Sequence, residues 1–181
     1  MKKLNIAVLA SGNGTIIPDI MKEFEIKLVL SNKLDARVLE NATQLGIKSM
    51  YVSNEDEMSK ILQEHNINLI LSIGYMKILS HTFVEKWRNK ILNVHPSLLP
   101  KFAGMINLKV HAEVLKAEEK QTGCTVHFVD EILDGGKILV QKTCEVSPND
   151  TPESLKNKVQ ALEGPAMVEA IKKICEENYE S

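Results

Sequence analysis

A chain of 181 residues, with 44% hydrophobic and 25% charged residues, has the composition of one globular domain with a full core. Its formal net charge of −2 at pH 7 comes from well-mixed acids and bases, which excludes a strongly basic surface for nucleic acid. We therefore expect a single domain over residues 1–181 that does not have nucleic acid as its partner.

The cysteine pattern and the hydropathy indicate the compartment. Cys124, Cys144 and Cys175 are scattered, odd in number and without a CxxC spacing. This pattern argues against a disulfide framework and a structural zinc site, and it suits a reducing compartment. No stretch of the sequence approaches the roughly 20 apolar residues that a membrane span requires. We expect a cytoplasmic protein that binds no metal and no membrane.

The first elements in chain order are a strand, a glycine turn and the start of a helix. The apolar segment 4–10 predicts a buried strand, Ser11-Gly12-Asn13-Gly14-Thr15 a turn, and residues 16–21 a helix opening. Such an arrangement points backbone N–H groups at an anion, so it predicts a phosphate site. A tight turn without a ligand is the alternative. A dinucleotide fingerprint would need a glycine where Ile17 stands.

Strands and helices continue to alternate along the next fifty residues. Apolar runs predict strands at 26–30, 49–52 and 68–73. The apolar faces of the helices between them are Leu34, Val38 and Leu45 for the first, and Met58, Ile61 and Leu62 for the second. Gly46 is expected to close the first helix, and Ser53 to cap the second with Asp56 in the capping-box position.

This alternation predicts the fold class. Nearly continuous apolar strands between amphipathic helices favour a doubly wound, mostly parallel sheet with helices on both faces. In such sheets, ligands bind beyond the carboxyl ends of the strands. The polar turns expected at that edge are Ser11 to Thr15, Gly74 to Lys77, and the segment that starts at Asn93.

The segment 93–100 has the strongest chemical pattern. The strand-like run 91–94 brings Asn93 and His95 two residues apart, so their side chains share one face of an extended segment. Pro96 and Pro100 restrain the chain that follows, which favours a loop over a helix. A histidine at the end of a strand can also be a structural residue, and that alternative stays open from these residues alone.

The C-terminal half adds a hairpin and two helices. A loop at 101–107 precedes a helix whose expected buried side is Leu108, His111, Val114 and Leu115. Strands at 123–129 and 137–141 are joined by a short turn, which predicts an antiparallel part of the sheet. The last helix is expected to begin at Thr151, an N-cap followed by a proline in the first turn.

The turn between those two strands carries Asp134, followed by Gly135 and Gly136. Glycines allow backbone angles that other residues avoid, so the carboxylate can be brought close to a ligand or a side chain. If Asp134 approaches His95, we expect its negative charge to favour the imidazolium ion and to raise the histidine pKa. The alternative is a surface turn in which the aspartate caps its own backbone.

Four motifs in this order resemble one enzyme family. They are Ala10-Ser11-Gly12-Asn13-Gly14, Gly74-Tyr75-Met76-Lys77-Ile78-Leu79-Ser80, Asn93-Val94-His95-Pro96-Ser97-Leu98-Leu99-Pro100, and Gly123 to Val129 with Leu133-Asp134-Gly135-Gly136. The pattern is similar to the formyltransferases that use 10-formyltetrahydrofolate, and it covers about residues 4–175. The resemblance implies a Rossmann-like formyltransferase fold and a monomer or weak homodimer.

The resemblance also implies a reaction and roles for residues. The reaction is transfer of a formyl group from 10-formyltetrahydrofolate to the amine of glycinamide ribonucleotide, in de novo purine synthesis. The catalytic residues implied are Asn93, His95 and Asp134. The residues implied to bind the acceptor are Gly14, Thr15 and Ile16 for its phosphate, and Glu163. Those implied to bind folate are Met76, Lys77, Ile78, Leu79, Asn93, Asp130 and Asp134.

The chain departs from the family pattern at four places. Thr15-Ile16 stands where Ser-Asn is usual, Lys77 where arginine is commoner, and no arginine lies in the 53–65 region. The segment 104–111 also differs from the usual shape. Two alternatives therefore remain: formyl transfer to a different amine, and a folate- or nucleotide-binding module without turnover. Asn93, His95 and Asp134 together argue against the second, because a binding module needs no such triad.

Overall fold

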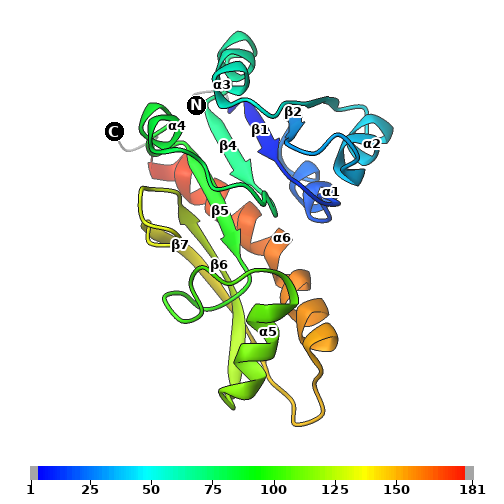
Figure 1. Ribbon diagram of the computed structural model, residues 1–181, viewed down its shortest axis with the longest axis vertical. Helices are drawn as coiled ribbons and strands as arrows, with labels where there is room; N and C mark the ends of the chain where they lie inside the picture. The colour runs from blue at the N-terminus through cyan, green and yellow to red at the C-terminus, as the bar shows by residue number, and fades with distance from the viewer. Residues whose placement is uncertain (1–3, 178–181) are drawn as a thin grey trace. The chain divides into compact units, whose positions relative to one another are not determined.

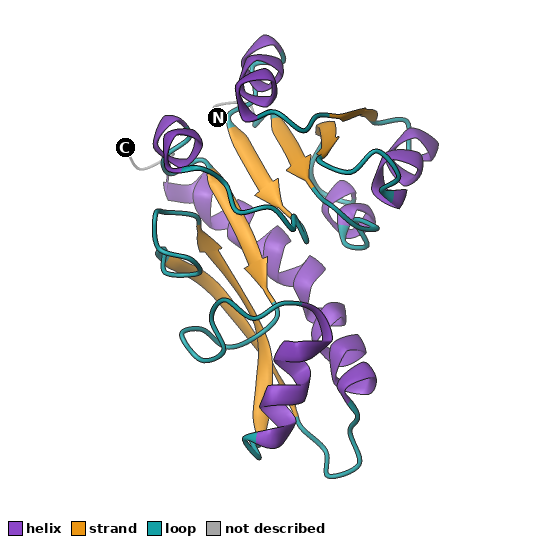
Figure 2. Ribbon diagram, viewed as in Figure 1, coloured by secondary structure: helices purple, strands orange, loops and turns teal. Residues whose placement is uncertain are grey.

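The computed structural model describes residues 4–177, which form two compact units (Figures 1 and 2). The division falls between Asn93 and Val94. Among the described residues, no helix combines the length and the apolar character needed to cross a bilayer. The single domain expected over residues 1–181 stays a prediction.

The first unit is an alternating α/β structure. Its elements are β1 (Ile6–Leu9), α1 (Ile17–Met21), β2 (Ile26–Ser31), α2 (Arg37–Gln44), β3 (Lys48–Tyr51), α3 (Glu55–Glu64), β4 (Leu69–Ser72), α4 (His81–Lys86) and β5 (Ile91–His95). Neighbouring strands pair in parallel, in the order β3-β2-β1-β4-β5. Every residue of β1 and β4 is buried, as expected for inner strands of a covered parallel sheet.

The winding of this unit reverses between β1 and β4. From β1 the chain moves outward to β2 and β3, and from β4 it moves the other way to β5. Because crossover connections are right-handed, winding in opposite directions puts helices on both faces of the sheet. The topological switch point, where ligands bind in open α/β sheets, therefore lies at the carboxyl ends of β1 and β4.

The second unit is a hairpin covered by two helices. It contains the last residues of β5, then α5 (Asn107–Lys116), β6 (Gln121–Phe128), β7 (Ile138–Glu145) and α6 (Pro152–Glu177). Strands β6 and β7 are antiparallel from Gln121–Glu145 to His127–Ile138. Helix α6 packs on both strands and on α5. Its fully buried side chains include Leu155, Val159, Met167 and Ile171.

The complete strand order is β3-β2-β1-β4-β5-β6-β7, with β1 to β5 parallel and β7 antiparallel to β6. This confirms the predicted fold class, including the antiparallel part near the C-terminus. The predicted loop after β5 is also confirmed, since residues 96–106 contain no helix or strand.

Two helical faces differ from the sequence prediction. Helix α2 begins only at Arg37, so Leu34 precedes it and is 75% exposed. Leu45 is the C-cap residue and is also exposed. On α5 the buried residues are Val110, His111 and Val114, whereas Leu108 faces solvent. In each case the apolar pattern of the sequence continues beyond the helical turns that are buried.

The cap of α3 is Asn54 rather than Ser53. The Asn54 side-chain oxygen accepts hydrogen bonds from the backbone N–H groups of Asp56 at 2.8 Å and Glu57 at 3.1 Å. The Ser53 carbonyl oxygen instead accepts a hydrogen bond from Lys77 Nζ at 3.2 Å. The predicted cap at Thr151 is confirmed, because its hydroxyl accepts from the N–H of Ser154 at 3.2 Å.

Removing the Asn54 cap is expected to destabilise the first unit. Asn54→Ala leaves two N–H groups of α3 without their acceptor and should lower the free energy of unfolding by about 1 kcal/mol. Chemical denaturation measures this loss. Ser53→Ala is the matched control and should change the stability by much less. Equal losses in the two variants would contradict the assignment of the cap.

Candidate active site

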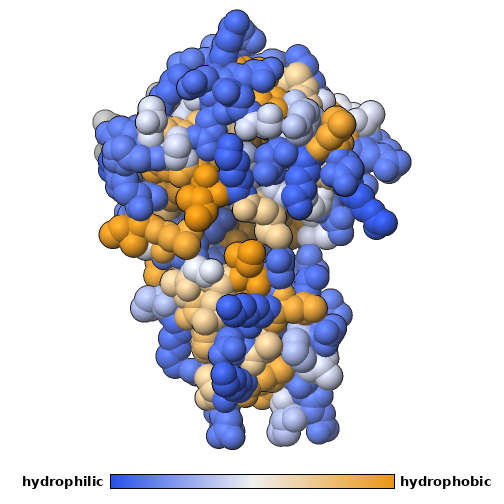
Figure 3. All heavy atoms as spheres, in the orientation of Figure 1, coloured by the Kyte–Doolittle hydropathy of each residue, from blue (hydrophilic) through white to orange (hydrophobic). Residues whose placement is uncertain are grey.

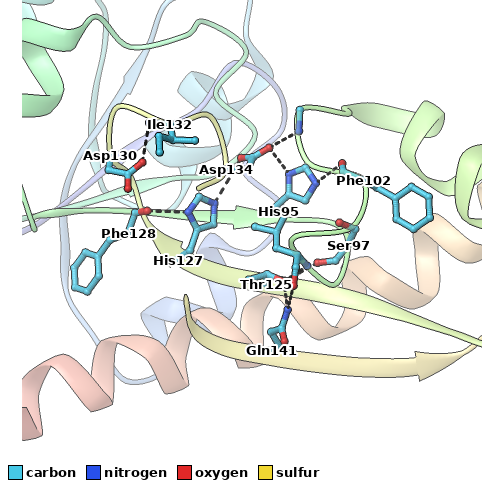
Figure 4. A network of polar contacts seen from close by, with 12 residues as sticks. His95, Ser97, Phe102, Thr125, His127, Phe128, Asp130, Ile132, Asp134 and Gln141 are labelled. Atoms are coloured by element: carbon cyan, nitrogen blue, oxygen red, sulfur yellow. Dashed lines mark hydrogen bonds and ion pairs between the residues drawn. The ribbon is translucent and has the colours of Figure 1, made fainter. Parts of the chain in front are cut away.

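A buried histidine and a partly buried aspartate form the centre of the site. His95 is the last residue of β5 and is 4% exposed, and Asp134 lies in the turn between β6 and β7. His95 Nδ1 is 3.2 Å from Asp134 Oδ2 (Figure 4). The approach that the sequence left conditional is therefore present, and it joins residues 39 positions apart in the chain.

The second ring nitrogen of His95 also faces an acceptor. Nε2 lies 3.2 Å from the carbonyl oxygen of Phe102, in the loop that follows β5. A carboxylate and a carbonyl oxygen can only accept, so the imidazolium form, with two N–H groups, satisfies both contacts. A neutral imidazole donates to one of them and leaves the other without a hydrogen.

Burial and partners act on the His95 pKa in opposite directions. Burial lowers the pKa of His95 below its usual value, while the charge of Asp134 and the Phe102 carbonyl oxygen raise it. Burial outweighs them, so the net direction is opposite to the sequence expectation. The sequence expectation included the effect of the carboxylate on the His95 pKa but not the larger effect of the loss of water around the ring. A lowered pKa makes the protonated imidazole a stronger proton donor.

Asp134 accepts a hydrogen bond from a backbone N–H and faces the rings of His95 and His127. Its Oδ2 accepts a hydrogen bond from the Gly104 N–H at 2.8 Å, and its Oδ1 lies 3.6 Å from His127 Nε2. Burial acts to raise the pKa of Asp134, but the bonds from His127 and Gly104 and the charge of His95 outweigh it and lower that pKa. The carboxylate therefore stays ionised beside His95.

His127 was not singled out by the sequence. It lies on β6, is 2% exposed, and its Nδ1 is 2.8 Å from the Phe128 carbonyl oxygen. The signal that was available is a polar residue in the otherwise buried strand 123–129. The Phe102 carbonyl and the Gly104 N–H had no signal, because any residue type supplies these groups.

The two glycines after Asp134 are required for a different reason than expected. Neither has a positive φ, whereas Asp134 itself has φ 54°. A Cβ atom on Gly136 would lie 1.9 Å from the Phe128 carbonyl oxygen, and one on Gly135 would lie 2.5 Å from Ile132 Cγ2. The glycines thus permit close packing of the turn onto β6, and the unusual backbone angle falls on the aspartate.

Buried hydroxyl groups hold the loop after β5. Thr125 Oγ1 donates to the Ser97 carbonyl oxygen at 2.7 Å and accepts from the Leu99 N–H at 3.0 Å. Gln141 Nε2 donates to Thr125 Oγ1 at 2.9 Å and to the Leu99 carbonyl oxygen at 3.0 Å (Figure 4). These bonds tie the loop to β6 and β7, and so fix the segment that supplies Phe102 and Gly104.

Asn93 lies two residues before His95 on β5 and is paired with Ser72 of β4. Both Asn93 and His95 belong to the same continuous strand, so the predicted spacing on an extended segment is present. Asn93 is partly buried.

The glycine loop after β1 turns its carbonyl groups towards the protein. The carbonyl oxygens of Gly12, Asn13 and Gly14 accept hydrogen bonds from Val38 N, Asn41 Nδ2 and Ile17 N. Gly14 has φ 65°, and a Cβ there would lie 2.5 Å from Val38 Cγ2. Three acceptors that would repel an anion are thus already engaged.

The other two residues of the predicted phosphate site differ in exposure. Thr15 is exposed, whereas Ile16 is 2% exposed and is the N-cap residue of α1. Ile16 can therefore offer an anion its backbone N–H but no side-chain group.

The segment after β4 exposes apolar side chains. Met76 is 45% and Ile78 is 75% exposed. On the face of the molecule shown in Figure 3, hydrophobic groups lie among hydrophilic ones. Lys77 and Ile78 line a pocket of about 630 Å³, together with Glu55 and Ser80. Glu55 is 3.9 Å from Lys77 Nζ and accepts a hydrogen bond from the Ser80 N–H.

The β6–β7 turn also exposes apolar side chains. Ile132 is 69% exposed and Leu133 is 57% exposed. Asp130 accepts a hydrogen bond from the Ile132 N–H at 2.8 Å. Asp130 therefore caps its own backbone, which is the behaviour that the sequence left open for Asp134.

Glu163 is a partly buried carboxyl group on α6. Burial raises its pKa from 4.5 to about 7, and the charge of Lys156 acts in the opposite direction. The Glu163 carboxyl group is therefore not fully solvated. Within residues 4–177, no group of three or more histidine, cysteine or acidic side chains is arranged to hold a metal ion.

A doubly wound sheet with a contact between a buried histidine and an aspartate at the end of a strand is the architecture of an α/β enzyme. The family model described as formyl transferase matches residues 4–171, and the chain belongs to that family.

Named relatives and solved structures agree with this family. The chain is 37% identical over 179 residues to "Phosphoribosylglycinamide formyltransferase" of Haemophilus influenzae, covering 90% of this chain and 82% of that protein. It is 37% identical over 180 residues to "Trifunctional purine biosynthetic protein adenosine-3" of Drosophila melanogaster, covering 90% of this chain and only 13% of that protein. The crystal structure of phosphoribosylglycinamide formyltransferase from Anaplasma phagocytophilum aligns with a TM-score of 0.91 and 35% identity, over 97% of this chain and 88% of that one.

The pKa of Glu163 predicts a pH-dependent stability. Because the folded pKa of about 7 exceeds the ordinary 4.5, the protein should lose stability as the pH rises from about 4.5 to 7. Glu163→Gln removes this loss. Above pH 7 its free energy of unfolding should exceed that of the wild type by up to about 3 kcal/mol, and at pH 4.5 the two should differ little. Denaturation at a series of pH values measures it.

Glu169→Gln is the matched control on the same helix. Hydrogen bonds from Lys142 lower the pKa of Glu169, so that substitution should remove a small stabilisation at neutral pH rather than add one. A Glu163→Gln curve parallel to the wild type would contradict the prediction.

Proposed function

We propose that this chain transfers a formyl group from 10-formyltetrahydrofolate to the amine of glycinamide ribonucleotide, a one-carbon transfer in purine synthesis. The observation that carries the proposal is the buried contact between His95 and Asp134 in a chain of the formyl transferase family. The choice of acceptor is supported by the name of the Haemophilus relative, 82% of which is covered by the match.

His95 and Asn93 are the proposed oxyanion partners. The acceptor amine attacks the formyl carbon, and negative charge develops on the formyl oxygen. The protonated Nε2 of His95 and the amide of Asn93 donate hydrogen bonds to that oxygen, which lowers the barrier. Nε2 must then exchange the Phe102 carbonyl oxygen for the formyl oxygen, which is the better acceptor once it is charged.

Asp134 has the proposed role of orienting His95 and of favouring its protonated form against the effect of burial. Its lowered pKa means that it remains a carboxylate while His95 Nδ1 donates to it. In the reaction, the attacking amine loses a proton and the folate nitrogen gains one when the carbon–nitrogen bond to folate breaks. The carboxylate and imidazolium stabilise the charges that appear between these two steps.

The acceptor is proposed to bind through its phosphate and its amine end. Gly14, Thr15 and Ile16 take the phosphate, with Ile16 contributing only its backbone N–H because its side chain is buried. Glu163 binds the amine end. A carboxyl group with a pKa of about 7 gains most from a cationic or donating ligand that replaces the lost water.

The donor is proposed to bind against Met76, Lys77, Ile78 and Leu79, with further contacts from Asn93, Asp130 and Asp134. Met76 and Ile78 offer exposed apolar surface for a planar ring system. Lys77 lines the adjoining pocket of about 630 Å³ and can attract the carboxylates of a folate tail. No metal is part of this proposal.

We also propose a cytoplasmic location and a single domain that is a monomer or weak homodimer. The three cysteines are free thiols, which suits a reducing compartment. Sedimentation at several concentrations tests the oligomeric state.

Loss of the central pair is expected to abolish the reaction. His95→Ala should lower kcat by 100-fold or more, since one oxyanion donor is worth on the order of 3 kcal/mol. Asp134→Asn should have an effect of the same order, because it removes the charge that favours the protonated form of His95. Steady-state assays with both substrates measure this, and calorimetry should show that folding and folate binding persist. His65→Ala, at the partly buried C-cap of α3, is the control with unchanged kcat. Normal turnover in either site variant would refute the catalytic assignment.

The acceptor is tested with a panel of amines. Glycinamide ribonucleotide should be formylated with a higher kcat/KM than an amino sugar phosphate or other amines, when each is supplied with 10-formyltetrahydrofolate. The panel matters because Ile16 and the segment 104–111 depart from the usual pattern. If another amine reacts and glycinamide ribonucleotide does not, the reaction class stands and the named acceptor is wrong.

A further inference from the structure

One buried hydroxyl group connects three strand ends of the first unit. Ser11 lies two residues after the end of β1 and is 5% exposed. Its Oγ donates to Asn32 Oδ1 at 2.6 Å and accepts a hydrogen bond from the Met76 N–H at 2.7 Å. The Ser11 N–H also donates to the Gly74 carbonyl oxygen at 3.1 Å.

These contacts lie at the topological switch point. Strand β1 pairs with β2 on one side and with β4 on the other, and Leu9 is in register with Leu30 and with Ser72. Asn32 follows β2, and the segment 74–79 follows β4. Ser11 is therefore the residue at which the ends of β2 and β4 are joined through β1.

The segment 74–79 needs such a hold because its side chains provide little packing. Met76 is 45% and Ile78 is 75% exposed, and Gly74 has φ 61°. Apolar side chains that point into water do not fix a backbone, whereas a buried hydrogen bond to the Met76 N–H does. The hydroxyl of Ser11 thus sets where this backbone lies.

Asn32 fixes the direction of that hydroxyl. Because the Asn32 oxygen accepts the Ser11 hydrogen, a lone pair of Ser11 Oγ is left for the Met76 N–H. The chain of hydrogen bonds runs from Met76 through Ser11 to Asn32, in one direction. Loss of the hydroxyl leaves both neighbouring groups without this partner.

The glycine loop on the other side of Ser11 has separate anchors. The Gly12 carbonyl accepts from Val38 N at 2.9 Å, and the Gly14 carbonyl accepts from Ile17 N at 3.0 Å. These bonds join the loop to α2 and α1 and do not pass through the Ser11 hydroxyl. Removal of the hydroxyl therefore acts on the segment 74–79 and spares the loop 12–16.

We propose that Ser11 is a positioning residue that sets the donor-binding segment 74–79 relative to the phosphate loop 12–16. Its hydroxyl touches neither substrate and acts through the Met76 backbone. The inference rests on the proposed function, since that function assigns the two segments to donor and acceptor.

The test is Ser11→Ala compared with Ser31→Ala. Ser31 is the matched control: it is fully buried at the end of β2, and its hydroxyl accepts from the Lys33 N–H at 3.1 Å, within its own turn. Ser11→Ala should raise the KM for 10-formyltetrahydrofolate by about tenfold, the factor expected for one lost hydrogen bond, and change the KM for the acceptor by less than about twofold. Ser31→Ala should leave both KM values unchanged, and Ser11→Thr, which restores the hydroxyl, should recover most of the donor KM.

A second measurement does not depend on turnover. Hydrogen exchange at the Met76 amide should become about tenfold faster in Ser11→Ala and stay unchanged in Ser31→Ala. Unchanged exchange at Met76, an unchanged donor KM, or equal effects in the two alanine variants would overturn the positioning role.

The two proposals fail in distinguishable ways. If the wild type binds a non-reactive 10-formylfolate analogue but formylates no glycinamide ribonucleotide, the acceptor is wrong, and analogue binding to Ser11→Ala still decides the role of Ser11. If the wild type binds no folate analogue, both the proposed function and the donor role of Ser11 are refuted.

Discussion

The contact between the His95 imidazole and the Asp134 carboxylate is the interaction on which the rest of the site depends. A buried imidazole and a partly buried carboxylate have lost much of their water, and each compensates part of that loss for the other. Burial lowers the pKa of His95, and the donors around Asp134 lower the pKa of that carboxyl group. The pair therefore keeps a negative charge beside an imidazole whose Nε2 can exchange the Phe102 carbonyl oxygen for a stronger acceptor.

Much of the second unit can be understood as support for this pair. Gly136 lets the turn pack onto the Phe128 carbonyl, and this brings Asp134 to β5. Thr125 and Gln141 hold the loop from which the Phe102 carbonyl and the Gly104 N–H reach the two partners. Neutral buried hydrogen bonds and steric fit thus position the charged groups, which costs less than adding further buried charges.

In the first unit, the two proposed binding segments offer mainly backbone groups and apolar side chains to a ligand, and few charged groups. Its glycine loop engages its own carbonyl groups, and its segment 74–79 exposes apolar side chains. Ser11 lies between them at the switch point of the sheet. Thr15, Ile16 and Lys77 lie in these segments, whose backbone groups are held by the hydrogen bonds of Gly12, Asn13, Gly14 and Met76.

The sequence by itself determined the order of elements, the parallel sheet with an antiparallel end, and the motifs of the formyl transferase family. It did so because period-2 and period-3.6 patterns, prolines and glycines act locally. It also pointed to Asn93, His95 and Asp134. It failed at the cap of α3, at Leu34 and at Leu108, where the pattern could not tell which turn of a helix the core would bury.

Only the tertiary structure decided the direction of the His95 pKa, the role of His127 beside Asp134, and the reason for Gly135 and Gly136. Each of these depends on groups distant in sequence that meet after folding. Burial, a carbonyl oxygen and an N–H group have no sequence signature, because every residue carries a backbone and its surroundings are set by the rest of the chain.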